Sequence, residues 1–148
     1  MAVLSENRKA KFDFEILEPF EAGIELLGHE VKAIKTHKMS LEGSYIFPRR
    51  GELWLVGATI SPYQPANTPK DYEPTRERKL LLHKKEIDYV LGKFSTKGLT
   101  ILPIRVYTKG NRIKVELAIA RKFKQHDKRE RIKERSEGRN IERTLKEI

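Results

Sequence analysis

The chain has 148 residues, enough for one domain of about 100 to 120 residues with an appendage but too few for two independent domains. Lys and Arg number 31 against 21 Asp and Glu, a formal net charge of +10 that favours a polyanionic partner: RNA, DNA or an anionic membrane. The lack of cysteine excludes disulfides and thiolate chemistry, and no apolar run reaches signal-peptide or membrane-span length, so we expect a cytoplasmic protein.

The positive charge is concentrated at the two ends of the chain. Residues 121–148 carry eleven basic and six acidic side chains, and residues 1–11 carry Arg8, Lys9 and Lys11 against a single glutamate. Apolar residues lie mostly before position 120. We therefore expect a folded domain at 1–120 and a basic tail at 121–148.

The first forty residues show an extended pattern followed by a helical one. Phe12, Phe14 and Ile16 alternate with charged residues, as in a half-buried strand that we expect Pro19 to interrupt. An extended pattern resumes in "FEAGIELLG", and "HEVKAIKTHK" at 29–38 then has the spacing of a short amphipathic helix.

Two strands and a long loop are predicted next. Residues 44–63 indicate two strands joined by a turn at 48–51, with Tyr45 and Phe47 facing the same way. Residues 61–75 contain four of the seven prolines, which argues against regular structure and predicts an unusually long surface loop. Loops of this length in compact domains are often functional.

A helix and a hairpin complete the predicted domain. The segment 76–94 contains one helical face with the spacing i, i+3, i+4, i+7, formed by Ile87, Val90, Leu91 and Phe94. Alternating apolar residues over 99–120 predict a hairpin that turns at 109–111, with Pro103 at an edge or a bulge.

About six short strands with one or two helices favour a mainly β fold. Among such folds we expect a small closed barrel of the OB type with flanking helices, because closure removes the exposed edges of a sheet. We expect the domain at 1–120 to be this barrel, and we expect the basic tail to be disordered in the free protein, since few apolar residues are available to offset its ordering.

No pattern in the sequence indicates catalysis. The four histidines fall in different elements, and "HEVKA" at 29–33 lacks the second histidine of the zinc-protease motif. A phosphate-binding glycine loop and a nucleophile elbow are also missing. Glu21 and Glu25 could form a carboxylate pair but are better explained as solvated strand residues. We predict a protein that is not an enzyme and that uses no cofactor and no metal.

Three basic stretches are candidates for contact with nucleic acid, although each is also compatible with ordinary solvated surface. The first, "ENRKAKF" at 6–12, combines cations with groups that can stack or hydrogen-bond to a nucleotide. The second, "RERKLLLH" at 76–83, would bring Arg76, Arg78 and Lys79 to the mouth of a helix. The third is the tail.

At these residues the chain resembles the SsrA-binding proteins, also called small protein B, which are partners of transfer-messenger RNA in bacterial ribosome rescue. The matches are "NRKA" at 7–10, "FEAGIEL" at 20–26, "GHEVKAIK" at 28–35, "SY" at 44–45, "RERKLLLHKKEI" at 76–87 and "QHDKRERIK" at 125–133. Their order and spacing make the resemblance specific, and it runs nearly from end to end.

The resemblance implies an OB-like barrel that binds the tRNA-like domain of transfer-messenger RNA. By position, Asn7 and Glu21 match family residues implicated in holding this RNA, and a carboxylate can do so by accepting hydrogen bonds from base amino groups or ribose hydroxyls. The expected RNA-binding residues are Asn7, Arg8, Lys9, Lys11, Glu21, Arg76, Arg78 and Lys79. The alternative is a general OB-fold RNA chaperone or ribosome-associated protein.

The resemblance also implies a role for the tail in the vacant decoding site and mRNA channel of a stalled ribosome, where it would become helical, and a delivery complex with elongation factor Tu. Where many members have Gly-Lys-Lys before the tail, this chain has Lys122-Phe123-Lys124, so Phe123 could either close the barrel or stack on RNA. The expected ribosome contacts are Lys122, Lys124, His126, Asp127, Lys128, Arg129, Arg131 and Lys133.

Overall fold

The computed structural model describes residues 1–123. The helices and strands, in chain order, are β1 (Val3–Glu6), α1 (Arg8–Asp13), β2 (Phe14–Ile24), α2 (Gly28–Lys35), β3 (Met39–Ser40), β4 (Tyr45–Arg49), β5 (Glu52–Val56), β6 (Thr59–Ile60), the 3-10 helix η1 (Pro65–Asn67), β7 (Arg78–Leu81), α3 (Lys84–Phe94), β8 (Leu99–Lys109) and β9 (Arg112–Lys122). The prediction of a mainly β fold with short helices is confirmed.

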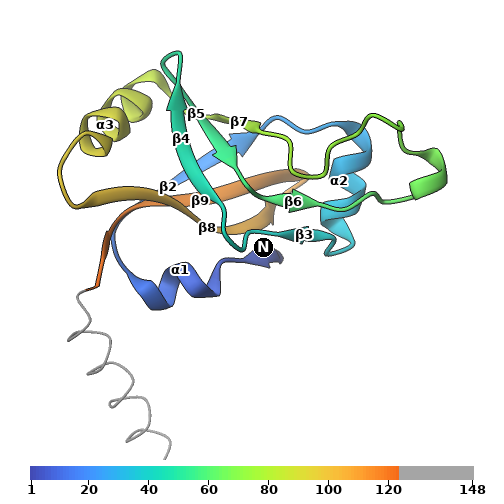
Figure 1. Cartoon of the computed structure of the whole chain (residues 1–148), viewed down its shortest axis with the longest axis horizontal. Coiled ribbons are helices and arrows are strands. Elements are labelled where there is room, and N and C mark those ends of the chain that lie inside the picture. Colours follow the sequence, from blue (N-terminus) through green and yellow to red (C-terminus); the bar gives the residue numbers. More distant parts are fainter. Residues whose placement is uncertain (124–148) are drawn as a thin grey trace, which may run out of the picture.

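One antiparallel sheet of seven strands forms the body of the molecule, in the order β1-β8-β9-β2-β7-β5-β4. The sheet curls so strongly that β4, at one end, comes to lie beside β8, near the other end (Figure 1). Strands β3 and β6 pair separately. No helix in residues 1–123 is long and apolar enough to cross a membrane.

The prediction of a closed barrel is wrong, because the hydrogen-bonded ladder is open between β4 and β8. Strand β1 pairs with β8 at Arg105–Tyr107, and Asn7 takes the next two carbonyls of β8. The Asn7 backbone N–H donates to the Ile104 carbonyl at 2.8 Å, and its side-chain amide donates to the Pro103 carbonyl at 2.9 Å. Proline also has no N–H to donate to a ladder. Asn7 therefore occupies the carbonyl groups of β8 with which β4 would have to pair to close the barrel.

The inner face of the curled sheet encloses the main hydrophobic core. Strands β5, β7 and β9 contribute Leu53, Leu80 and Leu117, which are fully buried, and helices α2 and α3 cover the ends with residues such as Ile34 and Val90. The apolar residues expected on one face of α3 point into this core, as predicted.

A smaller hydrophobic cluster lies on the outer face of the sheet beneath α1. Ala10 of α1 packs there against Leu102, Ile104 and the alanines of β9, and Phe14 borders the cluster. The bulge between Pro103 and Arg105, which confirms the expectation for Pro103, changes the facing of β8. Leu102 and Ile104 therefore lie on the outer face, whereas Val106 lies on the inner one.

The first strand begins later than predicted and continues further. Residues 8–13 form helix α1, because the Asn7 side chain accepts from the Ala10 N–H and caps it. Over so few residues, alternation does not separate a strand from one helical turn. Pro19 does not interrupt β2: only β9 pairs with β2 at this position, so the other edge has no partner that needs a donor.

The predicted hairpins are both present. Strands β4 and β5 turn at Arg50 and Gly51, whose φ angles of 52° and 74° match the left-handed turn that suits a two-residue connection. Strands β8 and β9 form the long hairpin, and β9 extends two residues beyond the expected domain boundary at 120. The proline-rich segment contains only η1, as its composition predicts.

Candidate RNA-facing surface

The outer face of the sheet carries the polar residues of four adjacent strands. Register places Arg105 of β8, Glu116 of β9 and Glu21 of β2 side by side in one row. The next row contains Tyr107, Lys114, Gly23 and Leu81. Because paired residues point to the same face, these side chains form one continuous surface opposite the core.

Glu21 is held as an ionised acceptor at the centre of this surface. The Tyr107 hydroxyl donates a short hydrogen bond to one carboxylate oxygen, and Lys109 Nζ lies 3.1 Å from the other. The hydrogen bond from Tyr107, followed by that from Lys109, lowers the pKa of Glu21. Burial and the bond to Glu21 raise the pKa of Tyr107, so the phenol stays protonated and donating. Glu21 keeps 37% of its side chain exposed, with lone pairs left for a ligand.

Two adjoining depressions flank Glu21. One, of about 560 Å³, is lined by Glu21, His83 and Glu86, and the other, of about 380 Å³, lies over Gly23. They share three lining residues: Leu81, Arg112 and Lys114. A Cβ atom at Gly23 would lie 3.3 Å from Leu81 Cβ, so glycine permits the close approach of β2 and β7 here. The site thus combines an acceptor, cations and an apolar wall.

Sequence reasoning missed Tyr107, Leu81 and the cations at 109, 112 and 114. The signal for Arg112 and Lys114 is present, since both occupy outward positions of the predicted final strand. Leu81 lies within a matched motif but was hidden by the expectation of a helix there. The pairing of Tyr107 with Glu21 spans 86 residues and cannot be found from local pattern.

Helix α1 places the N-terminal cations at the rim of the same outer face. The Arg8 side chain is 90% exposed, whereas Lys11 Nζ is 2.7 Å from a Glu6 carboxylate oxygen. Lys9 is also exposed. Asn7 itself is 95% buried, with both side-chain groups used to fix α1 to β8. We therefore assign Asn7 to positioning α1 and its cations.

The basic residues of the second stretch are divided between the interior and the surface. They do not lie at a helix mouth, because Arg78 begins strand β7 and α3 starts only at Lys84. Arg78 is fully buried, so its guanidinium has no surface to offer a phosphate. Arg76 is partly buried, and Lys79 points outward from β7 opposite Trp54.

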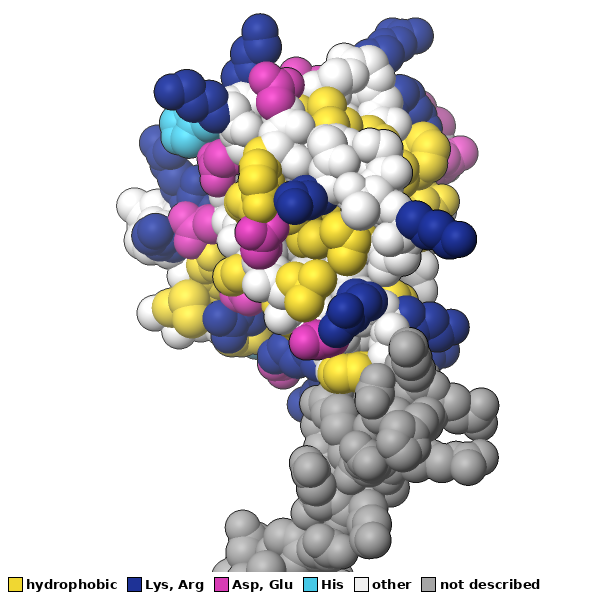
Figure 2. All heavy atoms as spheres, turned by 90° about the vertical axis from the view of Figure 1, so that its left-hand side faces the viewer, with side chains coloured by type: hydrophobic (Ala, Val, Ile, Leu, Met, Phe, Trp, Pro, Cys, Tyr) yellow, Lys and Arg dark blue, Asp and Glu magenta, His cyan; other side chains and the backbone are white. Residues whose placement is uncertain are grey.

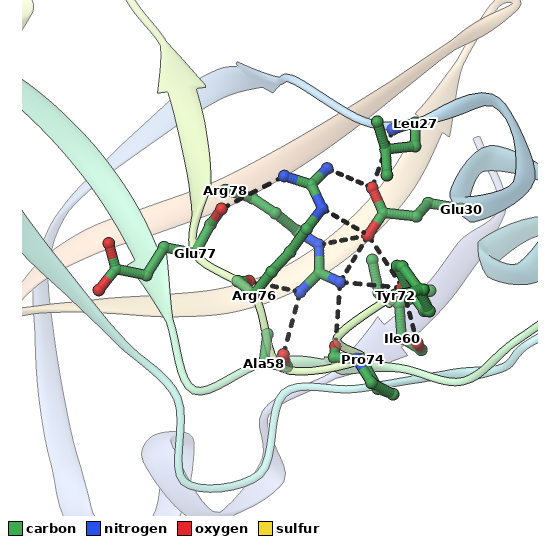
Figure 3. A network of polar contacts seen from close by, with 9 residues as sticks. All are labelled: Leu27, Glu30, Ala58, Ile60, Tyr72, Pro74, Arg76, Glu77 and Arg78. Atoms are coloured by element: carbon green, nitrogen blue, oxygen red, sulfur yellow. Dashed lines mark hydrogen bonds and ion pairs between the residues drawn. The ribbon is translucent and has the colours of Figure 1, made fainter. Parts of the chain in front are cut away.

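Arg76 and Arg78 converge on the buried carboxylate of Glu30 in α2 (Figure 3). Arg78 Nη2 lies 2.6 Å from Glu30 Oε2, and Arg76 Nε lies 3.1 Å from the same oxygen. Arg78 also donates to the Pro74 carbonyl, and the Tyr72 hydroxyl lies 3.0 Å from the carboxylate. The network therefore ties the proline-rich loop to α2.

The charge state of Glu30 follows from this network. Burial alone would raise its pKa, but hydrogen bonds from Arg76, the Leu27 backbone and Arg78 outweigh burial and lower the pKa to about 2. The carboxylate is thus ionised at neutral pH and compensates the buried Arg78. These residues hold α2, the proline-rich loop and the start of β7 together.

A hydrophobic patch marks the face that carries α3, with lysine and arginine side chains around it (Figure 2). Tyr89 of α3 is 43% exposed, yet its hydroxyl donates to Glu18 and its ring lies 6.0 Å from Phe20. Packing against β2 accounts for the position of this tyrosine.

The tail is described only at its beginning. Lys122 ends β9 opposite Phe14, and the Phe123 N–H donates to the Asp13 carbonyl at 3.0 Å. The remaining predicted ribosome contacts lie outside the described residues: Lys124, His126, Asp127, Lys128, Arg129, Arg131 and Lys133.

Comparison with known proteins connects this chain to a family. The model of the SmpB protein family matches residues 4–147. An SsrA-binding protein of Thermosynechococcus vestitus is 48% identical over 98% of this chain and 95% of its own length. An SsrA-binding protein of Rubrobacter xylanophilus is 49% identical over 99% and 97%.

A solved structure is also similar, described as "tmRNA-SmpB: a journey to the center of the bacterial ribosome". The two structures superpose with a TM-score of 0.69 at 44% sequence identity. The match covers 84% of this chain and 87% of the chain in the solved structure.

Proposed function

Because this chain belongs to the SmpB protein family, we propose that it is an RNA-binding adaptor of trans-translation. It binds the tRNA-like domain of transfer-messenger RNA, SsrA, and brings it to stalled ribosomes. The observation that carries this function is the similarity to SsrA-binding proteins, which are 48–49% identical to this chain over 98–99% of its length. The adaptor acts by binding and not as an enzyme.

The RNA-facing surface centres on Glu21. Its carboxylate accepts hydrogen bonds from base amino groups or ribose hydroxyls, whereas Lys109, Arg112 and Lys114 bind the phosphates on either side. Leu81 supplies an apolar wall for the flat face of a base or the edge of a ribose. An acceptor fixed among cations distinguishes nucleotide edges, which a purely basic patch cannot do.

Helix α1 and strand β7 extend this surface. Arg8, Lys9 and Lys11 bind phosphates beyond the Glu21 depressions, and Lys79 does so from the side of β7. Asn7 contributes by holding α1 in place. Arg76 and Arg78 contribute by fixing the loop and α2 behind the surface.

The basic tail gives the adaptor its second partner. It enters the vacant decoding site and mRNA channel of the small subunit, where rRNA phosphates surround its cations, and it becomes helical there. Elongation factor Tu joins the RNA-bound adaptor in the delivery complex. All of these partners are cytoplasmic.

The test of this function is the identity of the bound RNA and its dependence on Glu21. RNA that copurifies with the intact chain is sequenced, and we expect one dominant species that carries a tRNA-like end. The protein is then titrated with the tRNA-like end of this RNA alone. The Glu21→Gln variant removes the charge and should weaken binding by about tenfold. Glu25→Gln is the matched control, because Glu25 is an exposed glutamate that directly follows the last residue of β2.

A heterogeneous RNA population, bound equally by Glu21→Gln and the native chain, would identify a general RNA chaperone instead. The Glu21→Gln variant is expected to fold, because the carboxylate is partly exposed and lies outside the main core. Unfolding curves confirm this before the titration.

A further inference from the structure

Three aromatic side chains form a strip on the outer face of β4 and β5. Tyr45 and Phe47 are two residues apart on β4 and therefore point to the same face. Phe47 lies directly opposite Trp54 of β5. The side chains between them, Ile46 and Leu53, point into the core and are almost fully buried. We call Tyr45, Phe47 and Trp54 the aromatic strip.

Packing inside the molecule does not account for the exposure of the strip. Tyr45 is 45% and Phe47 is 44% exposed, although aromatic rings are usually drawn into a core. Phe47 contacts Phe94 of α3 edge-on, at 6.0 Å between ring centroids, and this contact fixes one side of its ring. The rings of neighbouring outward residues on a strand lie about 7 Å apart, twice the rise of about 3.4 Å between stacked bases.

Cations border the strip and are held in place. Arg49 makes a two-pronged ion pair with Glu77, at 2.5 and 2.8 Å, and its guanidinium lies 5.9 Å from the Trp54 ring centroid. The Trp54 indole N–H in turn donates to the Arg49 carbonyl at 3.3 Å. Lys79 lies opposite Trp54 on the next strand. The strip therefore has a rigid ring next to positive charge at one end.

The other end of the strip opens into a pocket next to α1. Tyr45 lines this pocket of about 220 Å³ together with Phe14 and Leu102, and the charged residues Lys9 and Asp13 also line it. A flat apolar group can lie against Phe14 and Leu102 while its anionic substituent meets Lys9. A nucleotide has this combination of a planar base and a phosphate.

We propose that the aromatic strip is a second RNA-contact site, which binds unpaired nucleotides by stacking their bases on Tyr45, Phe47 and Trp54. Exposed aromatic rings beside cations are the features that proteins use to bind single-stranded nucleic acid. Lys79 and Lys9 neutralise the backbone phosphates, whereas Arg49, paired with Glu77, holds the Trp54 ring in place. The site extends the RNA-binding function proposed above but is separate from the Glu21 depressions, which use different side chains.

The test uses Trp54 as a reporter, since it is the single tryptophan of the chain. The full-length protein is titrated with an eight-nucleotide oligouridylate, which has no stable base pairing, while Trp54 emission and the anisotropy of labelled oligonucleotide are followed. We expect quenching of Trp54, and Phe47→Leu and Tyr45→Leu should each weaken the quenching titration at least about fivefold. Leucine keeps an apolar side chain but removes the ring.

Tyr89→Leu is the matched control, because Tyr89 is equally exposed but lies on α3 outside the strip. It should leave the titration unchanged. Oligonucleotide that binds without a change in Trp54 emission, or with the same affinity in the Phe47→Leu and Tyr45→Leu variants, would overturn the proposal. If the Phe47→Leu and Tyr45→Leu variants bind oligonucleotide with unchanged affinity but bind ribosomal protein more weakly, the strip would be a protein-docking face instead.

Affinity of every variant for the tRNA-like RNA is measured in parallel. If Glu21→Gln weakens that affinity while the strip variants leave the oligouridylate titration unchanged, the strip proposal fails and the adaptor function stands. If the strip variants lose oligouridylate binding and no specific RNA copurifies, the adaptor function fails alone.

Discussion

At the scale of single residues, the contribution of an arginine–glutamate pair to stability depends on whether the pair is buried or exposed. Arg78 is fully buried, and Arg49 is about half exposed, yet both are paired with a glutamate. In water, a pair such as Arg49 with Glu77 stabilises the fold little, because solvent screens it and the side chains lose freedom. The pair of Arg78 with Glu30 differs, because removing either partner leaves an uncompensated charge in the interior.

Glu30→Gln should therefore lower the free energy of unfolding by about 3 to 5 kcal/mol. Glu77→Gln, the matched control at the exposed pair, should lower it far less. Urea titrations followed by Trp54 emission measure both. Equal losses in the two variants would contradict the importance assigned to the buried pair. Where Glu30→Gln fails to fold, Tyr72→Phe, which removes a single bond to the carboxylate, provides a graded variant.

The pH dependence of stability gives a second measure of Glu30. Its pKa is about 2 in the folded protein against an ordinary value of 4.5, so the folded state holds the proton less tightly than the unfolded state. The contribution of this carboxylate is complete above about pH 4.5 and is lost as the pH falls toward 2. Tyr72→Phe, with fewer bonds to the carboxylate, should show a smaller acid-induced loss than the native chain.

At the scale of elements, α1 depends on one residue. Asn7 caps the helix and also ties it to β8, where it occupies the part of the strand edge that a closed barrel would use. Six residues form no stable helix by themselves, so α1 owes its place to this residue and to the packing of Ala10. The positions of Arg8 and Lys9 therefore depend on Asn7 and on the packing of Ala10.

Asn7→Ala should lower the free energy of unfolding by about 1 to 2 kcal/mol, because it removes the cap and the bond to Pro103. Asn7→Asp keeps the cap acceptor but sets a second carboxylate oxygen against the Pro103 carbonyl at a buried site, so its loss should be at least as large. Both variants should also weaken binding of the tRNA-like RNA, since α1 carries cations of the proposed surface. Urea unfolding and RNA titration measure the two effects, and an unchanged stability in Asn7→Ala would refute the assignment.

Local pattern predicted the elements whose period is long enough to be unambiguous. The two hairpins, predicted within 44–63 and at 99–120 and found as β4–β5 and β8–β9, follow from alternation, and the buried face of α3 follows from helical spacing. Helix α1 did not, because "RKAKFD" fits a strand and a single helical turn equally well. The open barrel and the burial of Arg78 depend on contacts distant in sequence, so no local pattern contains them. The Glu21 site was predicted only through resemblance, and its partner Tyr107 lies 86 residues away.

At the scale of the whole molecule, the proposed function assigns different partners to the domain and to the tail. The sheet continues past Ala120, because β9 runs to Lys122, Arg121 pairs with Glu15 and the Phe123 N–H donates to Asp13. A division at 120 would remove contacts of the sheet itself. A truncation that tests the proposed division should therefore keep residues 121–123.

Truncation after Phe123 should leave affinity for the tRNA-like RNA within about threefold at moderate salt and should abolish tagging of stalled products. At low salt the loss should be greater, since the removed cations contribute nonspecific phosphate binding. RNA titration and a peptide-tagging assay on the same protein measure the two outcomes. Parallel loss of both at moderate salt would contradict the division, and truncation after Ala120 serves as the comparison that also damages the sheet.

The position of β9 has a mechanical consequence. This strand leads directly to the tail, and it is paired on both sides along nearly its whole length, with β2 and with β8. Its hydrogen bonds lie perpendicular to the strand. A pull on the tail along the strand axis therefore loads many bonds together in shear instead of peeling them one after another. Tension applied to the end of β9 would therefore pass into the interior of the sheet through two ladders at once.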